Sequence, residues 1–204
     1  MISPTRRFLL LALPVSLAGC SSVFQGKPPP KLYTLSPVRD FPPTLPKVNT
    51  QLLVDVPTAD GAIDTERIAL MRNAVSVDYF ADAAWTDRAP VLVQSLLVES
   101  FENTDKVGAI ARDSVTLRAD YVLMSDLRDF DAVYGNGAAP TIRVRIGLKL
   151  IHSDNRRIIG QREMQASADA GQDAIIPIVE AFDKALHQVI SDTVTWALTS
   201  IGHG

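Results

Sequence analysis

The sequence predicts an α+β fold, a mostly antiparallel sheet with a central helix and a long C-terminal helix packed on it. Residues 119–168 contain three long runs of alternating apolar side chains separated by turn signals, which is typical of an antiparallel meander. Residues 86–103 and 173–200 instead carry apolar side chains at helical spacing. Short strands in the first half of the chain complete the predicted sheet.

Four short runs predict the strands of the first half. They are rich in apolar and β-branched residues and cover residues 32–35, 52–56, 67–71 and 75–79. The proline-rich stretch from Pro37 to Pro46 lies between the first two and is expected to be a loop. The last two form a hairpin that Trp85 closes. We expect Trp85 to be buried, packing this hairpin against the helix that follows.

Thr86 is the expected cap of the central helix, because a threonine followed by an acidic residue often begins a helix. Val93 and Leu96 then fall on one apolar face, and the helix extends to about Asn103. A short strand is expected at residues 107–111.

The meander and the last helix carry the strongest periodicity. The three strands are expected at residues 119–134, 142–150 and 158–168. The middle strand alternates apolar residues with arginine, glycine and lysine, which predicts one buried and one wet face. In the last helix the apolar residues recur on one face: Ile175, Ile178, Val179, Phe182, Leu186, Val189, Ile190, Thr193 and Ala197.

Three acidic residues in the first meander strand, Asp126, Asp129 and Asp131, raise the question of a hard-cation site. In a regular strand Asp129 and Asp131 share a face and Asp126 points to the other. No glycine-containing calcium loop surrounds them. Cross-strand ion pairs are the favoured interpretation. The expected partners are Arg143, Arg145 and Lys149.

The composition bounds the class of protein. The chain has 204 residues and a formal net charge of −3. Its first 19 residues hold two arginines and no acid, so the remaining 185 carry 18 basic and 23 acidic side chains, a net charge of −5. An acidic chain without a lysine or arginine cluster argues against binding to nucleic acid and against electrostatic adhesion to anionic lipid.

The N-terminus has the pattern of a secretory signal. Arg6 and Arg7 precede an apolar segment of eleven residues, from Phe8 to Ala18, which is too short for a membrane span of about 20 residues. The segment ends in Leu17-Ala18-Gly19-Cys20, and Cys20 is the only cysteine of the chain. We therefore expect residues 1–19 to be a cleaved leader.

The run Leu-Ala-Gly-Cys resembles the lipobox of bacterial lipoproteins. The resemblance implies that the Cys20 thiol receives a diacylglyceryl group and that acyl chains, palmitate among them, hold the protein on the membrane. An ordinary signal peptide with a chance cysteine is the alternative. Ser21 in place of aspartate is compatible with sorting to the outer membrane. Residues 20–50 are then expected to be the lipidated N-terminus and a proline-rich tether, and residues 51–204 a single periplasmic α+β domain.

No catalytic, cofactor or metal site is predicted. His152, His187 and His203 lack a histidine, cysteine or glutamate partner at metal-ligand spacing. No Gly-x-Ser-x-Gly run and no glycine-rich phosphate loop occurs. Solvated or hydrogen-bonded histidines are the expected outcome, although an apolar groove for an acyl chain stays open because such a groove needs little polar chemistry.

The order of these features resembles the auxiliary lipoproteins of ABC-type transport systems, of the paraquat-inducible protein C type. The lipobox is followed by Tyr33-Thr34-Leu35-Ser36, then by the strand Leu52–Val56, by Val77–Phe80 with Trp85 before a helix, by the meander with Leu127–Tyr134, and by a terminal helix. These motifs span most of the chain after the leader.

The resemblance implies a non-catalytic component that is anchored in the outer membrane of a Gram-negative bacterium and faces the periplasm. It would assist a system that moves lipids or other hydrophobic molecules, with an Mce-domain protein and an ABC permease and ATPase as partner chains. Two alternatives remain open: a structural lipoprotein that tethers another envelope complex, and a lipid-anchored periplasmic hydrolase.

Overall fold

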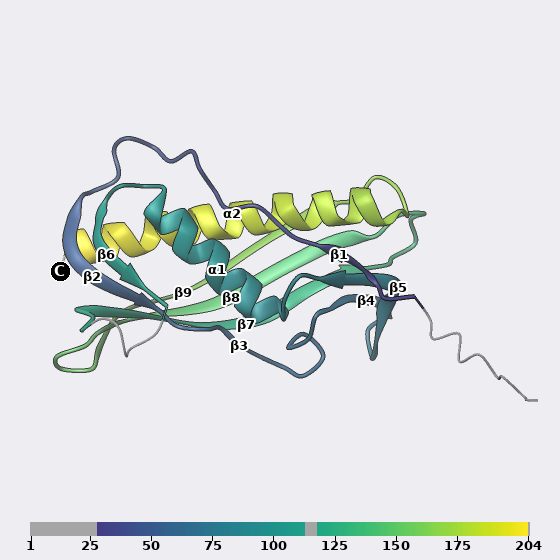
Figure 1. Cartoon of the computed structure of the whole chain (residues 1–204), viewed down its shortest axis with the longest axis horizontal. Helices are drawn as coiled ribbons and strands as arrows, with labels where there is room; N and C mark the ends of the chain where they lie inside the picture. The colour runs from purple at the N-terminus through teal and green to yellow at the C-terminus, as the bar shows by residue number, and fades with distance from the viewer. Residues whose placement is uncertain (1–27, 113–117, 204) are drawn as a thin grey trace, which may run out of the picture.

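Two helices lie on one face of a nine-stranded sheet in the computed structural model, which describes residues 28–112 and 118–203 (Figure 1). The α+β class is confirmed. The elements in chain order are β1 (Lys31–Tyr33), β2 (Val48–Val54), β3 (Thr58–Ala59), β4 (Arg67–Asn73), β5 (Ser76–Trp85), α1 (Ala89–Glu102), β6 (Val107–Ala111), β7 (Tyr121–Val133), β8 (Thr141–His152), β9 (Arg157–Asp169) and α2 (Ile175–Gly202).

Strand β7 is the centre of the sheet. Along one side it pairs antiparallel with β8, and β8 pairs antiparallel with β9, which confirms the meander. Along its other side it pairs in parallel with β2, β3 and β4 in turn. The aspartates between residues 126 and 131 do not interrupt β7. The register with β8 shifts between Leu127 and Asp129, which leaves a bulge at Arg128.

The sheet is mixed rather than antiparallel throughout. Its longest ladders, β7–β8 and β8–β9, are antiparallel, as is the β4–β5 hairpin. The pairs β1–β5 and β2–β6 and the pairings of β7 with β2, β3 and β4 are parallel, which the sequence analysis did not anticipate. Parallel partners are joined by long crossovers instead of tight turns, so no local turn signal marks them.

An aromatic cluster occupies the core between the sheet and α2. Trp85 is 1% exposed, which confirms its predicted burial. Its indole lies 5.6 Å from the ring of Phe130 on β7 and 5.1 Å from the ring of Phe182 on α2, measured between centroids. Trp85 therefore joins the end of β5 to α2 and β7, whereas the sequence analysis expected the following helix, α1, as its partner.

Helix α1 begins later than the sequence suggested. The residue at the cap position is Arg88, which makes no side-chain capping bond, and Pro90 stands in the first turn, where its missing N–H is no loss. Thr86 is not the cap. Its backbone N–H donates to the carbonyl of Tyr33 at 2.9 Å, so Thr86 still belongs to the sheet and the helix begins three residues later, at Ala89.

Residues 34–47 form a strap that runs over the two helices from the β1 end of the molecule to the β2 end (Figure 1). Leu35, Val38 and Leu45 of the strap are buried in the core. Prolines keep this segment out of helix and sheet, but the apolar residues between them still pack. The expected boundary at residue 51 is therefore corrected, because the packed domain begins at β1.

Ser100 ties the strap to α1, and its loss is expected to destabilise the fold. The buried Ser100 hydroxyl accepts a hydrogen bond from the Val38 N–H at 3.0 Å and donates one to the Leu96 carbonyl at 2.6 Å. Ser100→Ala leaves the Val38 N–H unsatisfied, which costs about 1–3 kcal/mol of unfolding free energy. Denaturant unfolding measures this loss. Ser95→Ala on the same helix is the control and should change stability by less than about 0.5 kcal/mol.

Tyr134 fastens the end of β7 to the start of α2. Its hydroxyl donates to Asp173, and Arg72 lies over its ring at 4.4 Å. Burial, followed by the Asp173 hydrogen bond, raises the pKa of Tyr134 from 10.0 to about 12. Since the folded pKa lies above the unfolded one, the stabilisation is complete below pH 10 and is lost as the pH rises from 10 towards 12.

Ultraviolet titration of phenolate absorbance checks the Tyr134 pKa. We expect a late phase with a midpoint near pH 12 that is missing from Tyr134→Phe. An identical titration curve for Tyr134→Phe, scaled to three tyrosines instead of four, would contradict the assignment.

Candidate functional site

Cys20, the predicted lipidation site, lies outside the residues that the structure describes. The described chain begins with Pro28-Pro29-Pro30 and enters the sheet at once, because β1 pairs with the last residues of β5. The strap follows directly. β1 and the strap are therefore the first described segments that follow Cys20 in the chain, and both are held by contacts with the rest of the domain.

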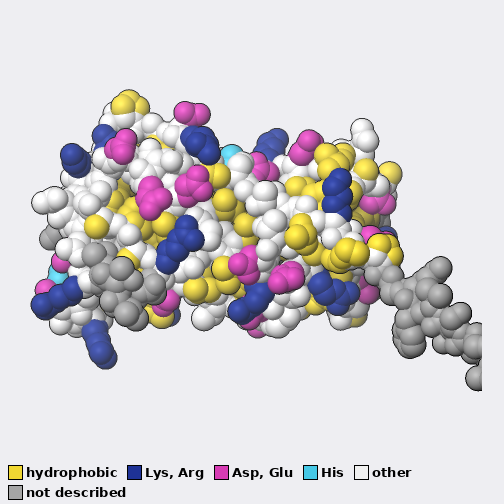
Figure 2. Space-filling view, viewed as in Figure 1, with side chains coloured by type: hydrophobic (Ala, Val, Ile, Leu, Met, Phe, Trp, Pro, Cys, Tyr) yellow, Lys and Arg dark blue, Asp and Glu magenta, His cyan; other side chains and the backbone are white. Residues whose placement is uncertain are grey.

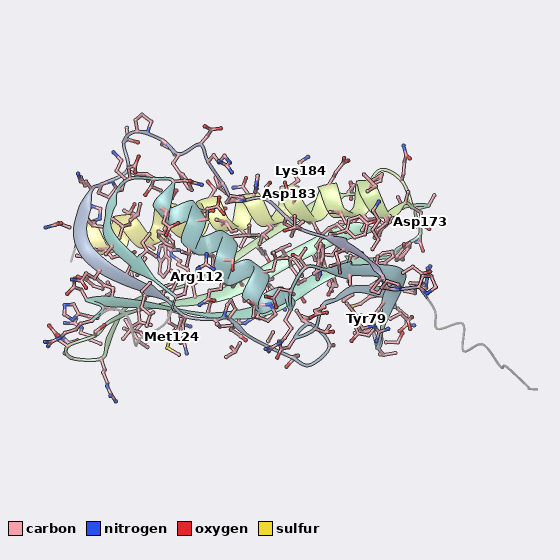
Figure 3. All side chains as sticks on the ribbon, in the orientation of Figure 1. Tyr79, Arg112, Met124, Asp173, Asp183 and Lys184 are labelled. Atoms are coloured by element: carbon pink, nitrogen blue, oxygen red, sulfur yellow. The ribbon has the colours of Figure 1, made fainter. Side chains whose placement is uncertain are left out.

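A clasp between Ser36 of the strap and Asp183 and His187 of α2 makes the first of these contacts. The Ser36 N–H donates to Asp183 Oδ1 at 2.7 Å, and the Ser36 hydroxyl donates to Asp183 Oδ2 at 2.9 Å. His187 Nε2 lies 2.8 Å from the Ser36 carbonyl oxygen and 3.1 Å from its hydroxyl. Figure 3 shows Asp183 on α2, on the side of the ribbon that the strap crosses.

The clasp holds a serine, a histidine and an aspartate, but not in the arrangement of a hydrolase triad. In a triad the carboxylate binds histidine Nδ1 while Nε2 faces the serine. Here Asp183 binds Ser36 directly and lies 3.8 Å from the same Nε2 atom of His187. The contacts suit attachment of the strap. Sequence reasoning expected His187 to be solvated or hydrogen-bonded, and the hydrogen bonds to Ser36 agree with this, but the sequence did not identify Ser36 as the partner.

The face of β7, β8 and β9 opposite the helices carries a ladder of charges. Arg145 Nε lies 2.5 Å from Asp129 Oδ2, and Arg143 Nε lies 3.2 Å from Asp131 Oδ1, which confirms the cross-strand pairs expected for these residues. Desolvation raises the pKa of the Asp131 carboxyl, and the hydrogen bond from Arg143 opposes that shift. The ladder thus neutralises charges that the sheet half buries.

Asp126 differs from the expectation in both its face and its partner. The bulge at Arg128 shifts the register, so that Asp126 lies opposite Gly147 and Asp129 opposite Arg145, on the same face. Asp126 Oδ2 binds Arg128 Nε at 2.9 Å. Lys149, the third expected partner, lies opposite Met124 instead. Among the described residues no three acidic, histidine or cysteine side chains are grouped to hold a metal ion.

Gly147 makes room for an arginine that bridges three strands. Arg128 of β7 lies across Gly147 of β8 and also pairs with Glu163 of β9. A Cβ atom at position 147 would stand 2.9 Å from Arg128 Cζ, closer than carbon atoms pack. On its polar face β8 alternates arginine and lysine, and Gly147 is the exception. The Arg128 guanidinium lies over this glycine.

An open cavity of about 550 Å³ adjoins this arginine on the same face. Val56 and Met124 line it and expose 41% and 43% of their surface. Met124 projects from the opposite side of the molecule to Asp183 (Figure 3). Exposed apolar side chains beside Arg128, Lys149 and charges of the opposite sign match the mixed chemistry of protein–protein contacts.

The face shown in Figure 2 mixes acidic and basic side chains without a continuous basic patch. Within the described ranges, no helix has the length and apolar character needed to cross a bilayer.

The other two histidines lie at the far end of α2. The His152 ring packs edge-on against Tyr121 with 5.0 Å between centroids. His203 Nδ1 lies 2.6 Å from the Thr199 carbonyl oxygen. Both line a second open cavity of about 840 Å³, and the sequence offered no signal that would bring them together.

Comparisons with known proteins match this fold. The family of ABC-type transport auxiliary lipoprotein components matches residues 33–194. The crystal structure of protein XCC0632 from Xanthomonas campestris, a DUF330 family member, is 28% identical with a TM-score of 0.79, and the match covers 83% of this chain and 95% of that one. A crystal structure of an uncharacterized protein, 16% identical with a TM-score of 0.54, covers 84% of this chain and 98% of its own and shares the fold.

One relative extends beyond the domain. An uncharacterized protein of Bradyrhizobium diazoefficiens is 30% identical over 188 residues, which are 91% of this chain but 50% of that protein. The chain therefore spans about half the length of this relative. The family match runs from the last residue of β1 to Val194 in α2 and includes the strap, α1 and strands β2 to β9. The protein belongs to the family of ABC-type transport auxiliary lipoproteins.

Proposed function

We propose that the protein is a non-catalytic, lipid-anchored component of an Mce/ABC-type transport system that moves lipids or other hydrophobic molecules across the cell envelope. Acyl chains on Cys20 hold it on the outer membrane, and its domain faces the periplasm. There it docks an Mce-domain protein, whose tunnel and ABC permease and ATPase are separate chains. Family membership supports the transport setting.

The observation that carries the docking role is the helix-free sheet face. The cavity beside Arg128 offers two exposed apolar side chains, Val56 and Met124, between charges of both signs. A polypeptide surface supplies complementary apolar and charged groups together, and methionine and arginine are enriched in such contacts. The clasp at Ser36 leaves this face free, because it lies on the helix side of the sheet.

Affinity purification of the native lipoprotein from membranes, with identification of the bound proteins, tests the proposal. We expect an Mce-domain protein and its ABC subunits to be recovered with the wild-type protein and to be lost with Met124→Glu. Val75→Glu is the matched control, because Val75 is 95% exposed in the β4–β5 turn and does not line the cavity. Thermal melts confirm that both variants fold.

The alternatives predict other outcomes. Recovery of an unrelated envelope complex in place of the Mce-domain protein would favour a structural tether. Turnover of an ester or glycan substrate that disappears in Ser36→Ala would favour a hydrolase. If the Mce-domain protein is recovered with Met124→Glu at the wild-type yield, docking does not use this face of the sheet.

A further inference from the structure

The cavity of about 840 Å³ at the end of α2 combines aromatic, aliphatic and basic side chains. It lies between the β8–β9 hairpin and the last turns of α2, and Arg162 is the one lining residue that it shares with the docking cavity. Its lining residues are Tyr121, His152, Asn155, Arg157, Ile158, Ile159, Arg162, Trp196, Thr199, Ser200 and His203. We call it the α2 groove. Its volume lies in the range of about 300–1,000 Å³ typical of small-molecule sites.

The floor of the α2 groove is apolar and shaped by a glycine. Trp196 lies on the backbone of β9 at Gly160, where a Cβ atom would stand 2.8 Å from the indole Cζ2. Any larger residue at position 160 would push the indole away. Trp196 is only partly buried, and Ile158 beside it is 49% exposed. The groove thus presents a flat apolar strip to solvent without anything in the described chain to cover it.

The rim of the α2 groove is basic. Arg157 and Arg162 line it, and no aspartate or glutamate does. Within the ranges that the structure describes, neither guanidinium makes an ion pair or a side-chain hydrogen bond. The three arginines of the sheet ladder, by contrast, all have carboxylate partners. In a chain with a net charge of −3, this is a local surplus of positive charge.

His152 lines the groove, and its ring is held against Tyr121. Its Nδ1 atom is inaccessible to water and has no hydrogen bond to any described residue, so this nitrogen does not face the open groove. The apolar floor and the two arginines without a described carboxylate partner are therefore the two independent observations that point to a ligand.

We propose that the α2 groove binds one anionic amphiphile, with its acyl chain along Trp196 and Ile158 and its phosphate or carboxylate head at the basic rim that Arg157 and Arg162 line. Arginine is suited to both head groups, because its planar guanidinium forms paired hydrogen bonds to carboxylate or phosphate oxygens. This site goes beyond the docking function, in which other chains carry the cargo. It gives this chain a ligand of its own.

Tryptophan fluorescence of the mature chain carrying Cys20→Ser tests the proposal. Every residue of the core lies between Leu35 and Ile201, so removal of the anchor leaves the fold in place. The probe is a monoacyl phosphatidylglycerol brominated on its acyl chain and used below its micelle concentration. Bromine quenches nearby indoles. We expect saturable quenching of Trp196, while Trp85, 1% exposed, provides the unquenched remainder.

Two kinds of variant define the binding mode. Trp196→Phe should leave only the unquenched emission of Trp85, which assigns the quenching to Trp196. Arg157→Gln with Arg162→Gln should raise the Kd by at least about tenfold, because the positive charge of the rim is lost. Arg156→Gln is the matched control, since Arg156 lies in the same hairpin but does not line the groove, and its Kd should equal the wild-type value. If the double variant does not fold, a brominated monoacylglycerol without charge replaces it and should bind wild-type protein at least about tenfold more weakly.

Each other outcome overturns the proposal. Equal affinity for the charged and uncharged probes would show that the arginines do not bind the head group. If inorganic phosphate displaces the probe at a concentration similar to that of the probe, the α2 groove is a phosphate site. If quenching occurs only with phosphatidylglycerol vesicles and the protein sediments with them, the α2 groove is a contact with the membrane surface. Because this assay uses the chain alone, its result is separate from recovery of the Mce-domain partner.

Discussion

Trp85→Ala is expected to lower the free energy of unfolding by about 3–5 kcal/mol. The side chain is 1% exposed and touches Phe130 and Phe182, whose rings also lie 5.0 Å from each other. Its removal opens a cavity where β5, β7 and α2 meet, and rigid elements on three sides limit any collapse. Since a domain of this kind is stable by about 5–15 kcal/mol, the loss is a large share of the total.

Denaturant unfolding followed by circular dichroism measures this effect. Trp85→Phe retains an aromatic ring and should cost less. Trp196→Ala is the comparison for an indole that is only partly buried, and it should also cost less than Trp85→Ala. A midpoint for Trp85→Ala that coincides with wild type would show that Trp85 does not support the core in solution.

Cys20→Ser is expected to abolish membrane anchoring completely. Cys20 is the only thiol of the chain, and a serine hydroxyl cannot form the thioether to diacylglyceryl. Each buried CH₂ group contributes about 0.8 kcal/mol, and two or more acyl chains are needed for stable attachment. Metabolic labelling with a fatty-acid analogue should mark the wild-type protein and not the variant, which should move from the membrane pellet to the supernatant.

The matched control for Cys20→Ser is Ser36→Ala. It removes the hydroxyl of the clasp but not the thiol, so it should keep both the label and the membrane location. Label on Cys20→Ser protein would refute lipidation at this residue. An unlabelled variant that still sediments with membranes would reveal a second attachment, through a partner or through the domain.

Local signals in the sequence account for most of the secondary structure. The strand at residues 107–111 was placed at its observed ends, and the meander and the last helix were found because turns and periodicity are properties of neighbouring residues. The cap at Thr86 was misplaced because β5 extends to Trp85 and the Thr86 N–H still pairs with Tyr33, a contact that no window around Thr86 reveals.

The contacts that build the sites join residues that are far apart in the sequence. Ser36 and Asp183 are 147 residues apart, and only the folded chain shows why a serine follows Tyr33-Thr34-Leu35. The α2 groove likewise combines Tyr121 of β7, the β8–β9 hairpin and the end of α2. Cys20 could be predicted because its motif is contiguous. The groove could not, because its residues are ordinary one by one and meet only in three dimensions.

Helix α2 separates the two places at which contact with lipid is expected, the N-terminal segment that carries Cys20 and the α2 groove. Its 28 residues rise by about 1.5 Å each and make a rod of about 42 Å. The chain leaves for the anchor beside the first turns of this rod, and Trp196 lies near its last turn (Figure 1). If Cys20 carries acyl chains and the α2 groove binds an amphiphile, the two lipid contacts of the protein therefore belong to opposite ends of this rod.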